Sequence, residues 1–67
     1  RVLFRSARIE PGVETEIIQC SFEPPKQVRR LLAVCGAQTG TWRWEVHRDA
    51  LDAVEQILSD LGVMLLR

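Results

Sequence analysis

The most regular pattern in this chain is an alternation of large apolar and polar residues in its second half. Trp42, Trp44 and Val46 share one parity, and the charged residues between them share the other. A period of two is typical of a half-buried β-strand, and an enclosed tryptophan buries about 150–250 Å². The pattern therefore predicts a strand over residues 40–47 whose tryptophan face belongs to the core.

A hairpin is predicted around Pro11-Gly12, because proline followed by glycine suits a type II turn. Its second arm runs to Phe22, with Ile18, Cys20 and Phe22 on one face. The residues of opposite parity in this arm are Val13, Thr15 and Ile17. Two interpretations stay open, a β-bulge near residues 17–18 or a strand covered on both faces.

The first of two predicted helices follows Pro24-Pro25 and stops at Gly36, since proline suits a first turn and glycine a helix end. Its apolar positions recur at helical spacing and are Val28, Leu31, Leu32 and Cys35. Lys26, Arg29 and Arg30 take the exposed side of this helix.

Asp49 is the predicted N-cap of the second helix, and Gly62 is its predicted stop. The apolar stripe consists of Leu51, Val54, Ile57, Leu58 and Leu61. The outer face is acidic and carries Asp52, Glu55 and Asp60. These carboxylates are interpreted as caps and a solvated surface, since Asp and Glu are favourable near a helix N-terminus.

Residues 37–40 are predicted to form a loop, and residues 63–66 a short buried strand whose continuation beyond Arg67 is left open. The element order is then β-β-α-β-α-β. The predicted fold class is α+β, a two-layer sandwich in which a small sheet of three to four strands packs against two helices on one face. Residues 7–67 form a single small domain in this prediction.

Residues 1–6, Arg-Val-Leu-Phe-Arg-Ser, resemble the in-frame translation of the end of a common sequencing adapter. On this interpretation the source is metagenomic, the gene is truncated at its 5′ end, and native sequence begins near Ala7. Removing Arg1 and Arg5 leaves seven basic and nine acidic residues, hence a formal net charge of −2. The alternative is that Val2 and Phe4 belong to a genuine first strand.

Composition is that of a globular domain, with 46% hydrophobic and 27% charged residues. Apolar runs such as residues 63–66 are too short to span a bilayer, and no secretory signal is apparent. The two cysteines, Cys20 and Cys35, fall on predicted apolar faces and are interpreted as buried free thiols. Free thiols favour a cytoplasmic location.

Enzymatic activity is not predicted, and no catalytic residue is assigned. His47 is the single histidine, and no nucleophile is paired with a base. A metal site from Cys20, Cys35 and His47 lacks the close ligand pairs that such sites use. No phosphate-binding glycine motif is present, so we expect no metal, no cofactor and no small-molecule substrate.

One group of residues carries a binding hypothesis. The basic side chains that could hold nucleic-acid phosphates are Lys26, Arg29, Arg30, Arg43 and Arg48. With a net charge near zero, any such binding depends on these side chains meeting in one local patch.

Over residues 16–61 the chain resembles the HARP domain of DNA-annealing helicases, and its layout is similar to the N-terminal damage-recognition-like domain of XPB-type helicases. The matching elements are Phe22-x-Pro24, the helix with Val28 and Leu31-Leu32, a glycine-containing turn, Trp42-x-Trp44-x-Val46, and the helix with Leu51, Val54 and Leu58. HARP-like sequences carry an Arg-Trp-Asp-like element before the tryptophan strand, where this chain has Ala37-Gln38-Thr39-Gly40. The resemblance implies accessory DNA binding beside a motor domain.

Two functions are therefore predicted from the sequence. The first is a small protein-interaction or oligomerisation domain that binds a protein partner or itself through a free sheet edge or through residues 63–66. The alternative is a nucleic-acid-binding accessory module that uses the five basic residues. No membrane partner is expected.

Overall fold

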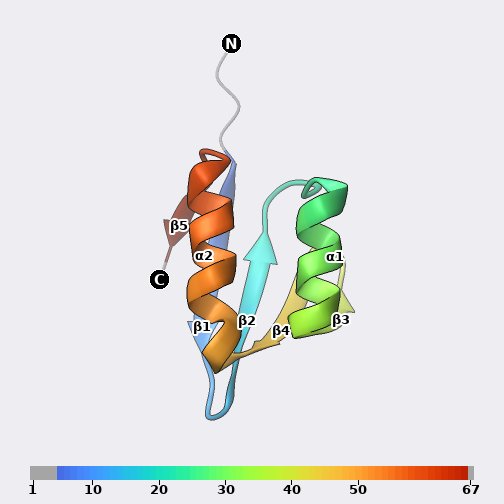
Figure 1. Cartoon of the computed structure of the whole chain (residues 1–67), viewed down its shortest axis with the longest axis vertical. Helices are drawn as coiled ribbons and strands as arrows, with labels where there is room; N and C mark the ends of the chain where they lie inside the picture. Colours follow the sequence, from blue (N-terminus) through green and yellow to red (C-terminus); the bar gives the residue numbers. More distant parts are fainter. Residues whose placement is uncertain (1–4, 67) are drawn as a thin grey trace.

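The computed structural model describes residues 5–66 and arranges them in two layers, a mixed β-sheet and a pair of helices on one of its faces (Figure 1). The elements are β1 (Ser6–Pro11), β2 (Thr15–Cys20), α1 (Lys26–Cys35), β3 (Gly36–Gly40), β4 (Arg43–His47), the 3₁₀ turn η1 (Arg48–Ala50), α2 (Leu51–Asp60) and β5 (Met64–Leu66). The predicted α+β class with both helices on one face is confirmed.

The sheet has five strands in the order β3-β4-β2-β1-β5, rather than the three to four that the sequence predicted. All neighbouring strands are antiparallel except β1 and β5, which are parallel. The missed strand is β3, because residues 37–40 were predicted to form a loop. This strand lies at the sheet edge with its side chains exposed, so it carries no apolar alternation that a pattern could reveal.

The structure of the β1–β2 hairpin decides whether its second arm contains a β-bulge near residues 17–18. Its register pairs Ile9 with Ile18 and shows no shift, so the arm has no bulge there. Val13 lies in the turn and is 89% exposed, which removes it from the strand pattern. Ile17 faces away from the helices, and the strand ends at Cys20 rather than at Phe22.

Trp42 does not belong to the predicted tryptophan strand, since β4 begins at Arg43. It occupies the turn between β3 and β4 with φ of 53°, and it is the one non-glycine residue among those described with a positive φ. A bulky residue in this region is strained. Its ring is stacked on Trp44, with ring centroids 6.3 Å apart and an angle of 28° between the ring planes.

The start of α2 differs from the prediction. Asp49 does not cap the helix; instead the Nδ1 atom of His47 accepts a hydrogen bond from the Asp49 backbone N–H at 3.2 Å, and η1 intervenes. Ala50, the residue before α2, makes no side-chain cap bond. The turn of η1 thus replaces the aspartate cap that the sequence pattern indicated.

Gly36 and Gly62 both follow a helix, but for different physical reasons. Gly62 has φ of 79°, and the Val63 N–H bonds the Leu58 carbonyl while the Gly62 N–H bonds that of Ser59, which is a Schellman motif. Gly36 has an extended φ of −175°. A Cβ atom there would lie 1.9 Å from the Glu45 carbonyl oxygen, so close approach to β4, rather than a left-handed cap, requires this glycine.

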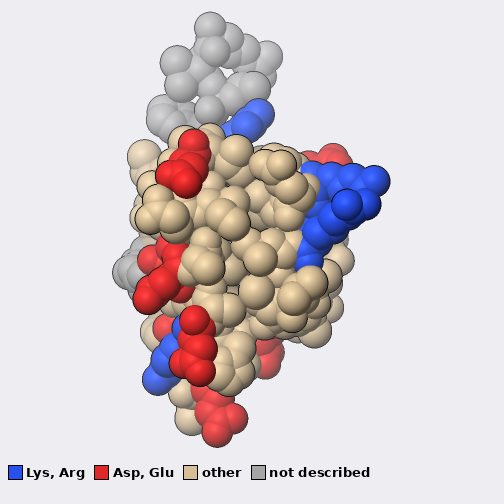
Figure 2. Space-filling view, viewed as in Figure 1, with Lys and Arg blue, Asp and Glu red and all other residues tan. Residues whose placement is uncertain are grey.

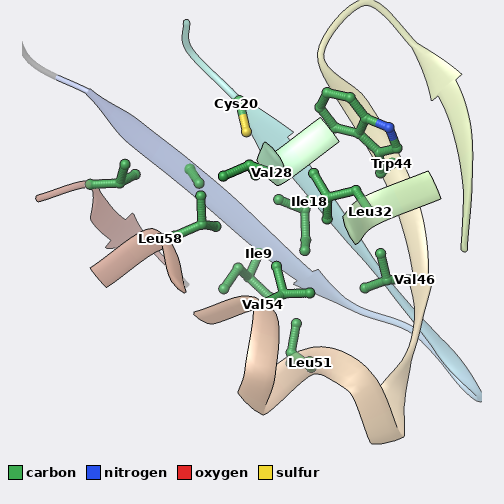
Figure 3. Packing of buried hydrophobic residues seen from close by; sticks show 12 residues of the cluster. Ile9, Ile18, Cys20, Val28, Leu32, Trp44, Val46, Leu51, Val54 and Leu58 are labelled. Carbon is green, nitrogen blue, oxygen red and sulfur yellow. The ribbon is translucent and has the colours of Figure 1, made fainter. Parts of the chain in front are cut away.

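The core lies between the sheet and the helices, as Figure 3 shows for the buried side chains that point toward one another from both layers. Its members are Ala7, Ile9, Ile18, Cys20, Val28, Leu32, Trp44, Val46, Leu51, Val54, Leu58 and Val63. Trp44 is the largest and is 2% exposed. The predicted core position of Trp44 is therefore confirmed. Both cysteines are free thiols, but only Cys20 is buried as predicted, and Cys35 is half-buried.

The adapter-like segment falls partly outside the described residues, as do Val2 and Phe4 of the alternative first strand. Its last two residues contact the sheet. The Arg5 carbonyl accepts a hydrogen bond from the Met64 N–H at 2.9 Å, and Ser6 is the first residue of β1. The origin of this segment stays a prediction.

Replacing Trp44 by alanine is expected to lower the free energy of unfolding by about 3–5 kcal/mol, because it leaves a large cavity in the core. Urea unfolding followed by circular dichroism measures this loss. Trp42→Ala is the matched control and is expected to cost less, since the Trp42 side chain is only half-buried. Equal losses in the two variants would contradict the assigned core role.

Burial raises the pKa of the Cys20 thiol from 9.0 to about 11. Because the folded-state value is the higher one, the stabilisation from the protonated thiol is complete below pH 9.0 and is lost as the pH rises toward about 11. Unfolding titrations across this interval are expected to show a decline that Cys20→Ala abolishes. A decline of equal size in that variant would assign it to other groups.

Candidate interaction surfaces

Three of the five predicted phosphate-binding residues lie together on α1. Lys26, Arg29 and Arg30 occupy its first half, where the apolar stripe of Val28 and Leu32 turns toward the sheet. This spacing leaves the basic side chains on the outer side of the helix. Figure 2 shows Lys and Arg gathered at the α1 side of the molecule.

Arg29 is not a freely solvated residue, contrary to the sequence prediction. Its guanidinium carbon lies 5.9 Å from the centroid of the Trp42 ring, and its Nη2 atom lies 3.8 Å from Oε2 of Glu23. Its Nε atom is buried and has no hydrogen-bond partner. Arg29 therefore supports the strained Trp42 turn in addition to contributing charge.

Arg43 and Arg48 do not join the α1 group. Arg43 alternates with the buried Trp44 and so lies on the sheet face opposite α1. Arg48 directly follows β4, and the rise of a strand places it about 16 Å from Arg43. Its Nη2 atom donates a hydrogen bond to the Gly12 carbonyl. Its backbone N–H also bonds the Glu14 carbonyl at 3.2 Å. The structure thus brings three of the five residues together and separates the other two.

The face of the sheet that the helices leave open is mainly polar. The Thr15 hydroxyl donates to Oε1 of Glu45 at 3.1 Å, and the Gln19 amide donates to the Thr41 carbonyl at 3.1 Å. The first bond joins β2 to β4, and the second joins β2 to the turn between β3 and β4. The large apolar side chains that the strands present on this face are Ile17 of β2 and, at the β5 margin, the exposed Met64 and Leu66.

The β5 edge, meaning the unpaired side of Met64–Leu66, was predicted as a buried strand and is instead an edge strand. Met64 is 56% exposed and Leu66 36% exposed. The Met64 N–H points toward β1, where it bonds Arg5. Because backbone groups alternate in direction along a strand, the N–H and carbonyl of Leu65 point away from the sheet.

The opposite margin of the sheet is the β3 edge, formed by Gly36–Gly40. Its side chains are small or polar and mostly exposed. The pairing of β3 with β4 is irregular between Gln38 and Gly40, and the Gln38 side-chain amide donates to the Gly40 carbonyl at 3.0 Å. This edge lacks the lysines and prolines that proteins use to block strand addition, although its irregular register is one such device.

Charge is divided between the two sides of the helical layer. In Figure 2 the larger blue patch lies over α1 and most of the red atoms lie over α2, with a smaller blue patch beside the start of α2. On α2, Asp52 and Asp60 are exposed, and Asp60 accepts a hydrogen bond from the Gln56 amide at 3.0 Å. The helical layer is therefore mainly positive over α1, next to β3, and mainly negative over α2, next to β5, with Arg48 just before α2 as a basic exception.

Glu16 is a buried carboxylate that the sequence pattern did not single out. It is 8% exposed on the helix side of β2, and its Oε2 atom has no hydrogen-bond partner in the described structure. Its parity with Ile18 and Cys20 could have revealed its inward position. Burying an unpartnered polar atom costs free energy, so the burial of the Glu16 carboxylate lowers the stability of the fold.

The described residues provide little for small-molecule chemistry. Residues 5–66 form no pocket, and they contain no group of three or more His, Cys, Asp or Glu side chains that could hold a metal ion. Within the same residues, neither helix is long and apolar enough to cross a membrane. The surfaces that carry a binding hypothesis are the α1 basic group and the two sheet edges.

Comparison of the chain with models of protein families, with curated proteins and with solved structures gave no match. The resemblance to HARP-like domains, seen in the sequence pattern, therefore stays a prediction.

Proposed function

We propose that this chain is a small protein-interaction or oligomerisation domain whose contact surface is the β5 edge. The observation that carries the proposal is an apolar edge strand with two exposed large side chains, Met64 and Leu66. An open edge of this kind accepts an added strand, with backbone hydrogen bonds supplying affinity and alternate side chains supplying specificity.

The geometry of β5 suits strand addition in two respects. The outward N–H and carbonyl of Leu65 supply a donor and an acceptor for an incoming strand. Met64 and Leu66 lie on the open face beside Ser6 and Arg8, their partners in β1. An incoming strand could therefore cover apolar surface at the same time as it pairs with the backbone.

The placement of the basic residues also favours a protein partner over nucleic acid. A phosphate-binding surface requires charges that act together, yet Arg43 and Arg48 lie on other parts of the molecule. Trp44 is enclosed in the core, so it cannot serve as a stacking platform for bases. The free Cys20 and Cys35 thiols support a cytoplasmic setting for this interaction.

Total chemical synthesis of the full chain with an N-methyl group on Leu65 tests the proposal, because it removes the outward donor without changing a side chain. Peptides selected from a phage-displayed library for binding to the unmodified chain are expected to bind the N-methylated chain at least about tenfold more weakly. Isothermal titration calorimetry measures both affinities. Met64→Ala is expected to lower the affinity for the same peptides by removing an apolar contact.

N-methylation of Val13, in the exposed β1–β2 turn, is the matched control and should leave these affinities unchanged. Circular dichroism establishes that each synthetic chain is folded. Peptide binding that is indifferent to the Leu65 modification, or a library that yields no binder, would contradict the β5 edge as the contact surface.

A second candidate function is nucleic-acid binding by α1, which one observation favours. Lys26, Arg29 and Arg30 lie on one side of a single helix, with Trp42 beside Arg29. Phosphate contacts by such a group are sequence-independent and depend on salt. The resemblance to HARP-like domains supports the same function.

Replacing Lys26 and Arg30 with glutamine tests this candidate. Both are exposed, so stability should change little, whereas Arg29 also supports Trp42. If both contact phosphates, the slope of log affinity against log salt for single-stranded DNA should fall by about 1.4 in magnitude. Fluorescence anisotropy measures the slope, with Arg43→Gln as the control. An unchanged slope, or no binding at about 100 μM protein in low salt, would exclude α1 as a nucleic-acid surface.

A further inference from the structure

The two open edges of the sheet differ in charge as well as in composition. The β3 edge lies on the side of α1, whose exposed Lys26 and Arg30 are basic. The β5 edge lies on the side of α2, whose exposed Asp52 and Asp60 are acidic. Figure 2 shows most of the basic surface of the helical layer over α1 and most of its acidic surface over α2. The helix beside the β3 edge is therefore basic, and the helix beside the β5 edge is acidic.

Strand direction allows the two edges to pair with each other. Three successive antiparallel steps lead from β1 through β2 and β4 to β3, so β3 runs opposite to β1. The remaining edge strand, β5, is parallel to β1. A second copy of the chain shifted along the sheet, without rotation, would thus present its β3 antiparallel to β5 of the first. Both helical layers would then lie on the same side.

Symmetric pairing of like edges brings like charges together. A two-fold β5–β5 contact would place α2 beside the α2 of the other copy, with Asp52 and Asp60 on both sides. A β3–β3 contact would likewise place Lys26 and Arg30 of the two copies side by side. Placing like charges side by side is unfavourable, so the charge pattern beside each edge disfavours pairing of like edges.

We propose that the partner of the β5 edge is the β3 edge of a second copy of this chain. The proposal rests on the proposed function above and names its partner. The contact is head to tail, with α1 of one copy beside α2 of the next and their opposite charges facing each other. Because such a contact leaves a β3 edge and a β5 edge free at the ends, association continues into longer assemblies as concentration rises.

Sedimentation velocity of the full chain tests the proposal over protein concentrations from about 10 μM to about 1 mM. We expect a weight-average mass that rises with concentration in about 20 mM NaCl and falls when salt is raised to about 300 mM, since salt screens exposed pairs. N-methylation of Leu65 is expected to reduce this association at least about tenfold.

Two charge variants test the pairing directly. The first is Lys26→Glu with Arg30→Gln, and the second is Asp52→Asn with Asp60→Lys. Glu suits the start of α1 and Lys the end of α2, so both variants should fold, which circular dichroism checks. Each alone is expected to associate about fivefold more weakly than the parent chain, and an equimolar mixture is expected to recover association. Glu14→Lys, in the β1–β2 turn, is the control that changes charge away from both edges.

Several outcomes would overturn the inference. Association that strengthens with added salt would indicate pairing of like edges. If the two charge variants lost no more association than Glu14→Lys does, the charge beside the edges would be irrelevant to pairing. A chain that stays monomeric throughout, while peptide binding still depends on Leu65, would exclude a second copy as the partner and retain the proposed function. Loss of both kinds of binding would exclude both proposals.

Discussion

The arrangement of this protein depends on one constraint, which is that two ten-residue helices can cover only one face of a five-stranded sheet. Burial of Trp44, with Val28 and Leu32 in the same core cluster, joins the helical layer to the sheet. Apolar burial is the main favourable contribution to folding, and most of the large apolar side chains of the described residues serve this single interface. The opposite face and both margins of the sheet consequently remain in contact with solvent.

The strained Trp42 turn illustrates how tertiary contacts hold a conformation that the local sequence disfavours. A left-handed backbone conformation is unfavourable for a residue with a large side chain. Stacking on Trp44 and the Arg29 guanidinium over the ring provide compensating contacts from the sheet and from α1. Arg29 is therefore positioned for packing first, which limits its use in phosphate binding.

The two margins of the sheet lie beside helices of different charge, an asymmetry that the net charge of zero does not reveal. Equal numbers of acidic and basic residues suggest no preference for any partner, but their separation between α1 and α2 distinguishes the β3 side from the β5 side. Complementary surfaces of this kind set orientation and selectivity more than affinity. An apolar edge with directional flanking charge is consistent with both binding proposals made for β5.

The sequence by itself determined those features that periodicity or local chemistry encodes. The helices, the hairpin and the inward face of Trp44 follow from spacing, because a helix or strand that packs on one side repeats its apolar residues at a fixed period. The Schellman end of α2 at Gly62 follows from backbone freedom at glycine.

Only the tertiary structure decided what depends on neighbours distant in the chain. The β3 strand has no apolar face, so nothing in residues 36–40 could distinguish it from a loop before its pairing with β4 was known. The β5 segment has the same apolar composition whether it lies in the middle or at the margin of a sheet, and strand order alone made it an edge. Arg43 points to the sheet face opposite α1 because side chains alternate along β4, and Arg48 lies beyond the end of that strand. Closeness in sequence therefore does not determine which charged side chains share a surface.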